Sequence, residues 1–150
     1  MTQDEIEELI EGQAICRIAF KGGEYPYLAP FQYALRDGAV YFHFTNYGRK
    51  IKLLKQNSRV CVGFERIEPD LSEYRFVVLS GSLKLVDDSE ERARVIEKMA
   101  EDGKSSYSEN LLAAHGFSKE RGWSALRPNS PMVIVKLVDV TSTIGLKSPY

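Results

Sequence analysis

Between residues 41 and 50 the chain reads YFHFTNYGRK, from Tyr41 to Lys50. The first four residues alternate between two faces, which is the period of a half-buried strand. Residue types that form turns and cap helices follow over Thr45–Gly48. The next eight residues, Arg49–Gln56, predict a short helix. A strand is therefore expected to lead directly into the N-terminus of a helix.

The start of this helix has the features of an anion site. Two adjacent cations, Arg49 and Lys50, occupy its first turn, and the hydroxyl of Thr45 precedes it. Unpaired backbone N–H groups and the positive end of the helix dipole favour an anion there, and a guanidinium binds phosphate through two parallel hydrogen bonds. No acidic residue occurs from Gly38 to Phe64, against five Lys or Arg. We predict a phosphate site at this position.

An ordinary solvated helix face is the alternative explanation for these basic residues. Cations in the first turn, however, oppose the helix dipole by ~0.3–1 kcal/mol each. A bound anion would offset that cost, and this consideration favours the functional interpretation.

Composition limits the class of protein. With 150 residues, the chain is expected to form one domain over residues 1–150 with a sizeable core. Its 43% hydrophobic and 27% charged residues are ordinary for a globular protein. A net charge of −1 argues against a nucleic acid or an anionic membrane surface as partner. No apolar run approaches the ~20 residues that span a bilayer.

The two cysteines are informative about the cellular compartment of the protein, because disulfides are rare in reducing compartments. Cys16 and Cys61 lie in predicted strands and form no CxxC motif, zinc-binding spacing or disulfide framework. The N-terminus is acidic, unlike a signal peptide. We expect reduced, buried thiols in a cytoplasmic protein, and no metal site.

The remaining pattern predicts a mainly β fold with helical additions. Strands are expected at residues 14–20, 25–35, 40–45, 59–64, 74–86 and 132–138, the last continuing toward 144. Helices are expected at 2–12, starting with a capping box formed by Thr2 and Glu5, at 49–56, from 89 onward and at 108–114. The hairpin signal Asp37-Gly38 suggests that the first three strands form an antiparallel meander. Six strands without a βαβ rhythm indicate a closed or partly closed antiparallel barrel.

Prolines and a glycine inside the predicted strands indicate local departures from regular strand pairing. Pro26 and Pro30 lack the N–H that a central strand needs, so the second strand must be an edge, bulged, or open where something docks. Gly81, in the middle of the fifth strand, predicts a bulge or a sharp bend.

The run from Tyr41 to Lys50, with 53–57 and the strand 60–64, resembles the FMN-binding split barrel of the pyridoxamine 5′-phosphate oxidase superfamily. In that family a strand ending in a Thr-Asn or similar pair precedes a Ser/Gly-Arg-Lys turn and an Asn-Pro-like strand start, where this chain has Asn57-Ser58. Residues 17–20, 26–30 and 81–88 extend the resemblance over most of the chain. It is strongest to the branch of nitroimidazole-resistance-type flavoproteins.

The resemblance implies a six-stranded antiparallel split barrel, FMN as cofactor, and a homodimer with flavin at the subunit interface. It assigns Thr45, Arg49 and Lys50 to the FMN phosphate and the backbone around Pro30 to the isoalloxazine ring. The complete set of predicted cofactor-binding residues is Ala29, Pro30, Phe31, His43, Phe44, Thr45, Gly48, Arg49, Lys50 and Trp123.

Two departures from the family pattern bear on the substrate. A true pyridoxamine 5′-phosphate oxidase carries a C-terminal Arg-Leu-His-type motif that recognises the substrate, and this chain lacks it. Phe76 stands near the position of a flavin-contacting Gln. We therefore expect a protein that is not a true pyridoxamine 5′-phosphate oxidase.

Two functions remain open. The first is an FMN-dependent oxidoreductase acting on an unidentified small molecule, with a nicotinamide or a deazaflavin as electron donor. The second is a non-catalytic carrier or sensor that binds flavin or haem. His43, on the same strand face as Thr45, is the candidate proton donor, and a barrel histidine with a satisfied hydrogen bond is its alternative role. Trp123 is a candidate to cover the flavin, or else a packing anchor.

Overall fold

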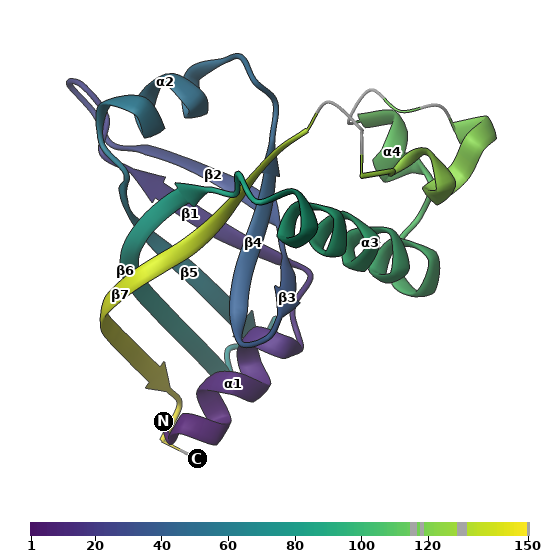
Figure 1. Cartoon of the computed structure of the whole chain (residues 1–150). Coiled ribbons are helices and arrows are strands. Elements are labelled where there is room, and N and C mark those ends of the chain that lie inside the picture. Colours follow the sequence, from purple (N-terminus) through teal and green to yellow (C-terminus); the bar gives the residue numbers. More distant parts are fainter. Residues whose placement is uncertain (115–116, 118, 129–131, 150) are drawn as a thin grey trace.

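The computed structural model describes residues 1–150 except 115–116, 118, 129–131 and 150. Its centre is an antiparallel sheet curled into a half-barrel, with helices at its ends and along one side (Figure 1). The strands are β1 (Ile15–Phe20), β2 (Tyr27–Gln32), β3 (Ala34–Arg36), β4 (Ala39–Phe44), β5 (Arg59–Ile67), β6 (Tyr74–Leu85) and β7 (Val133–Lys147). The helices are α1 (Gln3–Glu11), α2 (Arg49–Gln56), α3 (Ser89–Ser106), α4 (Asn110–Ala114) and the 3₁₀ segment η1 (Lys119–Ala125).

The mainly β split-barrel fold is confirmed, but the sheet has seven strands and not the predicted six. The predicted strand 25–35 is divided at Tyr33 into β2 and β3, which lie at opposite edges of the sheet order β2-β1-β5-β6-β7-β4-β3. The Tyr33 hydroxyl donates a hydrogen bond of 2.5 Å to the carbonyl of Ile10, which fixes this crossing point against α1.

The predicted meander of the first three strands is wrong. β1 pairs with β2 and β5, whereas β3 pairs with β4, and β4 pairs with β7. The hairpin signal at Asp37-Gly38 predicted the β3–β4 turn correctly, and both residues have positive φ there. The meander fails because β2 and β3 diverge at Tyr33 and do not pair with each other.

The prolines and Gly81 occupy the special positions that the sequence predicts. β2, which contains Pro30, is an edge strand. The pairing of β6 with β7 shifts register between Ser80 and Ser82, so Gly81 marks a bulge. A Cβ at Gly81 would lie 2.7 Å from the carbonyl oxygen of Val138, too close for any other residue without a backbone shift.

The barrel interior follows the predicted alternation. Cys16, Ile18 and Phe20 of β1 are buried, as are Phe42 and Phe44 of β4. The other face of β4 is also covered, because α3 packs against it and forms a second apolar cluster. β4 is therefore buried on both faces, which fixes its position and that of the loop after it.

One thiol lies outside this interior. Cys16 is buried, but Cys61 is exposed, so the expectation of two buried cysteines is wrong for the second. Val60 and Val62 of β5 take the inner face, and the alternation of the strand turns Cys61 outward.

Two short helices close the ends of the half-barrel. α1 begins with the predicted capping box, in which Thr2 and Glu5 exchange hydrogen bonds, and it buries Leu9. α2 buries Ile51 and Leu53 in the same core. In the part of the chain that the structure describes, no helix is long and apolar enough to cross a bilayer.

Candidate phosphate corner and neighbouring pocket

The loop between β4 and α2 is held in shape by its own residues. The Thr45 hydroxyl donates a hydrogen bond of 2.8 Å to the carbonyl of Tyr47, which closes the turn. Gly48 is the N-cap of α2 with φ of 99°, a conformation that favours glycine, and it makes no side-chain cap. The N–H groups of the first turn therefore have neither an intrahelical acceptor nor a capping side chain. Such a turn is open to an anion.

Two of the three predicted phosphate ligands, Arg49 and Lys50, lie over aromatic rings. The Cζ atom of Arg49 is 4.9 Å from the centroid of the Tyr27 ring. The Nζ atom of Lys50 is 5.4 Å from the ring centroid of Phe31 and 5.7 Å from that of Phe44. We call these five residues the basic corner. Among the described residues, no carboxylate forms an ion pair with either cation, so both charges remain available.

The structure brings most of the predicted site residues to this corner. Phe31, Phe44, Arg49 and Lys50 are directly part of it, Gly48 is the N-cap of the helix that carries the two cations, and Thr45 lies in the turn that enters it. The Phe31 side chain, however, points into the barrel, where its ring centroid lies 5.2 Å from that of Phe44.

Ala29 and Pro30 belong to the same edge strand, β2. Ala29 is half-buried opposite Ile18, and Pro30 is exposed opposite Arg17. Their strand is covered on one edge only, by β1, so its other edge is open in this subunit.

His43 and Trp123 lie apart from the corner, in a pocket between β4 and the helices α3, α4 and η1. His43 is half-buried opposite Ile134 of β7. The pocket lining also includes Gln32, Tyr33, Met99, Asp102, Phe117 and Met132. His43 and Thr45 are two residues apart on β4 and its extension, so about 7 Å of strand separates His43 from the turn that enters the corner.

Trp123 has a clear packing role. Its side chain is 7% exposed, and its ring lies against Gly103 of α3. A Cβ at Gly103 would be 2.1 Å from the Trp123 ring, so glycine is required for this close approach. The packing-anchor interpretation therefore accounts for Trp123, which at the same time forms one wall of the pocket that contains His43.

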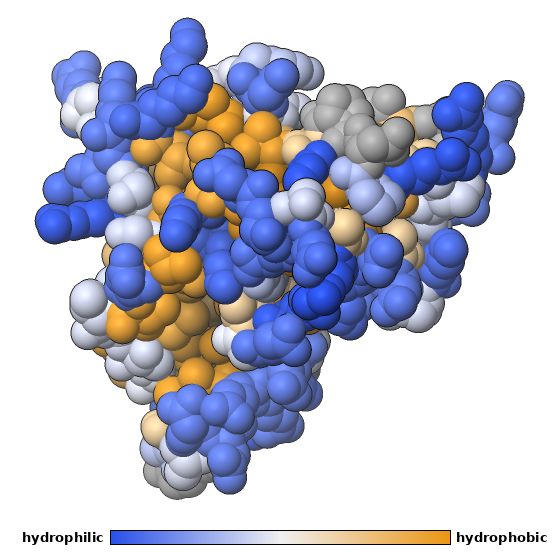
Figure 2. Space-filling view, viewed as in Figure 1, coloured by the Kyte–Doolittle hydropathy of each residue, from blue (hydrophilic) through white to orange (hydrophobic). Residues whose placement is uncertain are grey.

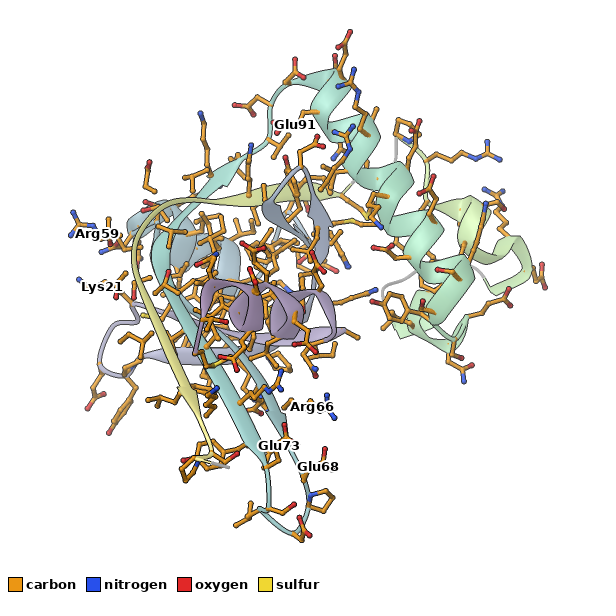
Figure 3. The ribbon with its side chains drawn as sticks, turned by 90° about the horizontal axis from the view of Figure 1, so that it is seen from below. Lys21, Arg59, Arg66, Glu68, Glu73 and Glu91 are labelled. Carbon is orange, nitrogen blue, oxygen red and sulfur yellow. The ribbon has the colours of Figure 1, made fainter. Side chains whose placement is uncertain are left out.

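A second charged cluster, which no sequence pattern indicated, lies beside α3. Glu91 accepts hydrogen bonds from the Tyr41 hydroxyl (2.8 Å) and from Lys136 (3.1 Å), and it points from the first turn of α3 toward the sheet (Figure 3). These bonds, that of Tyr41 first, lower the pKa of Glu91. Burial and the bond to the Glu91 carboxylate raise the pKa of Tyr41. The three side chains thus form hydrogen bonds with one another, and the cluster links α3 to β4 and β7.

The outer face of the sheet carries a row of apolar residues, some of them exposed to water. Gly63, Val78 and Ile144 are neighbours across β5, β6 and β7, and Leu146 continues the row. Ile144 is 53% and Leu146 is 55% exposed. Figure 2 shows hydrophobic side chains along the lower part of these strands.

Comparison with known proteins agrees with this architecture. Residues 2–120 match the family model described as pyridoxamine 5′-phosphate oxidase. The comparison with curated proteins found no match.

Solved structures share the fold at low sequence identity. A conserved hypothetical protein from Mycobacterium tuberculosis is 20% identical with a TM-score of 0.74, covering 97% of this chain and 84% of that one. An FAD-binding protein from Mesorhizobium loti is 18% identical with a TM-score of 0.70, covering 99% and 96%. A putative 5-nitroimidazole antibiotic resistance protein from Bacteroides thetaiotaomicron is 20% identical with a TM-score of 0.66, covering 97% and 83%. At these identities the likeness establishes the split-barrel fold.

Proposed function

Because this chain belongs to the pyridoxamine 5′-phosphate oxidase family, we propose that it is an FMN-dependent oxidoreductase whose cofactor phosphate binds at the basic corner. The observation that carries the proposal is the pair Arg49 and Lys50, which begin α2 with no carboxylate partner among the described residues. Solved relatives of the same fold that are described as FAD-binding support a flavin as the ligand.

The donor set of the corner fits a phosphate monoester. Arg49 offers a planar guanidinium that can donate two parallel hydrogen bonds, and Lys50 offers an ammonium group. The uncapped first turn of α2 adds backbone N–H groups. FMN ends in such a dianionic phosphate, whereas riboflavin has none. The open edge of β2 at Ala29 and Pro30 is the proposed neighbour of the isoalloxazine ring, and Trp123 is proposed to lie near it from the pocket side.

The cofactor assignment predicts an order of affinities. Purified protein should show flavin absorption bands, and the apoprotein should bind FMN at least about tenfold more tightly than riboflavin, because only FMN gains charge-assisted hydrogen bonds at the corner. Titration followed by flavin fluorescence, with FAD as a third ligand, measures this. Equal affinity for FMN and riboflavin would show that the corner is not a phosphate site, and a Soret band would identify a haem protein instead.

His43 is the proposed proton donor for the reaction. A bound flavin supplies the electron chemistry, and the chain must then deliver a proton to the reduced small molecule. Imidazole is suited to this because it titrates near neutral pH. Of the lining residues that the structure describes, none beside His43 is a Lys or Arg, which argues against a phosphorylated vitamin B6 substrate.

A non-catalytic flavin or haem carrier is the second candidate function, and one observation favours it. The cavity beside His43 measures about 20 Å³ in this subunit, room for roughly one water molecule. A substrate would need the helices around Trp123 to move, whereas a carrier needs no such space.

We also propose that the protein is a homodimer joined through the apolar outer face of the sheet. Sedimentation at micromolar concentration should give a dimer, because contiguous exposed apolar rows mark interfaces. Ile144→Lys should shift the protein to monomer, since it places a charge in the row beside Val78. Leu71→Lys, at the exposed tip of the β5–β6 hairpin, is the control and should remain dimeric. A monomeric wild type would refute the proposal.

A cytoplasmic location is the remaining part of the proposal. Both thiols, Cys16 and Cys61, are free. Free thiols are usual in reducing compartments, where disulfides are rare.

A further inference from the structure

Arg49 is the more exposed cation of the basic corner, and the Tyr27 ring lies directly beneath it. The guanidinium carbon is 4.9 Å from the ring centroid, within the ~6 Å over which a cation and an aromatic face attract each other. Tyr27 is half-buried, and its ring centroid lies 5.8 Å from that of the buried Phe20. The ring is therefore fixed to the barrel core, and Arg49 rests on a fixed surface.

Stacking leaves the hydrogen-bonding capacity of Arg49 intact. A guanidinium that contacts a ring through its flat face keeps its five N–H groups in its own plane, pointing away from the ring. An anion approaches through those edges, so the aromatic contact and phosphate binding do not compete. The same contact that holds the side chain thus leaves its donors free.

An aromatic ring also differs from the usual partner of an arginine. A carboxylate would hold Arg49 equally well, but it would cancel the positive charge and compete with phosphate. The segment from Gly38 to Phe64 contains no acidic residue, and no described carboxylate pairs with Arg49. Lys50 is held in the same way, over Phe31 and Phe44.

We infer that Tyr27 is a positioning residue, whose ring holds the Arg49 guanidinium ready for a phosphate ester without neutralising it. The inference rests on the proposed phosphate site and adds to it a residue that the sequence does not single out. Ordering a free arginine on binding costs roughly 0.5–1.5 kcal/mol, which corresponds to ~2–12-fold in affinity. The ring removes that cost before the ligand arrives.

The test compares FMN with riboflavin on three tyrosine variants. Tyr27→Leu should lower the ratio of FMN to riboflavin affinity by ~3–10-fold and leave riboflavin binding unchanged, because only the phosphate contact loses its support. Tyr27→Phe keeps the ring and should keep the ratio. Tyr25→Leu is the matched control, since Tyr25 precedes the same strand, is 69% exposed and should not affect the ratio.

The ratio of FMN to riboflavin affinity distinguishes a loss of Arg49 positioning from a loss of protein stability. A partly unfolded variant would bind both ligands more weakly and by the same factor. Arg49→Ala and the double variant Tyr27→Leu/Arg49→Ala complete a cycle, in which the double variant should equal Arg49→Ala alone. If Arg49→Ala lowers the ratio and Tyr27→Leu does not, or if the two effects add, the inference is overturned while the phosphate site stands. If Arg49→Ala itself leaves the ratio unchanged, the phosphate site is wrong and the inference falls with it.

Discussion

Arg49→Ala and Lys50→Ala will each weaken FMN binding by ~1.5–3 kcal/mol, or roughly 10–150-fold, and together they will abolish it at micromolar concentrations. The physical reason is that each cation donates charge-assisted hydrogen bonds to a dianionic phosphate from a helix terminus that itself favours negative charge. Neither residue has a compensating carboxylate among the described residues, so the loss is not offset by the release of an internal ion pair.

The matched controls for this prediction lie on the same helix. Lys52 and Lys55 are exposed cations of α2 beyond its first residues, and Lys55 is in the last turn. Lys52→Ala and Lys55→Ala should change FMN affinity less than threefold, because general attraction by surface charge is screened by salt. Titrations at low and at physiological salt measure both sets. Equal losses from all four substitutions would mean that net charge, and not the corner, attracts the cofactor.

His43→Gln will slow turnover by ~10²–10⁴-fold if this side chain delivers the proton. Glutamine keeps a polar group of similar size at the half-buried position on β4 but cannot titrate. The measurement is anaerobic stopped-flow reoxidation of the dithionite-reduced holoprotein, with menadione as the oxidant and thermal melts of both proteins beside it.

The same hypothesis predicts the direction in which the reoxidation rate changes with pH. A proton donor acts in its protonated form, so the wild-type rate should be high below the pKa of the imidazole and fall as pH rises through it. The His43→Gln rate should be low and flat over the same range. An unchanged rate with a lowered melting temperature would instead make His43 a structural residue of β4, and the carrier function would then account best for the protein.

The sequence predicted those parts of the fold that depend on near neighbours. The residue pattern at 14–20 predicted β1, the pair Thr2 and Glu5 predicted the capping box, and Gly81 predicted the bulge. The division at Tyr33 was missed because the alternation of residue types runs through it without interruption. Which strands pair is decided by contacts far along the chain, so the predicted meander failed.

The same distinction applies to the candidate site. Thr45, Arg49 and Lys50 are close in sequence, and their charge pattern alone indicated an anion site. The ring beneath Arg49 belongs to Tyr27 of β2, which is distant in sequence from the cations, so their local charge pattern does not indicate it. Likewise, His43 of β4 and Trp123 of η1 line one pocket because the Trp123 ring packs against Gly103 of α3. The sequence does not show that contact.

The central position of β7 has a consequence for how this protein is made. β7 lies between β6 and β4 in the sheet, and its pairing joins Phe44 to Val133, yet it follows both strands in the chain and is synthesised after them. Until then β4 and β6 each present an unpaired, largely apolar edge, a condition that favours association with other chains. Pairing between distant segments is also intrinsically slow. During synthesis the chain therefore passes through a stage in which β1 to β6 have emerged and the barrel still cannot close, and that stage is where chaperones would protect it.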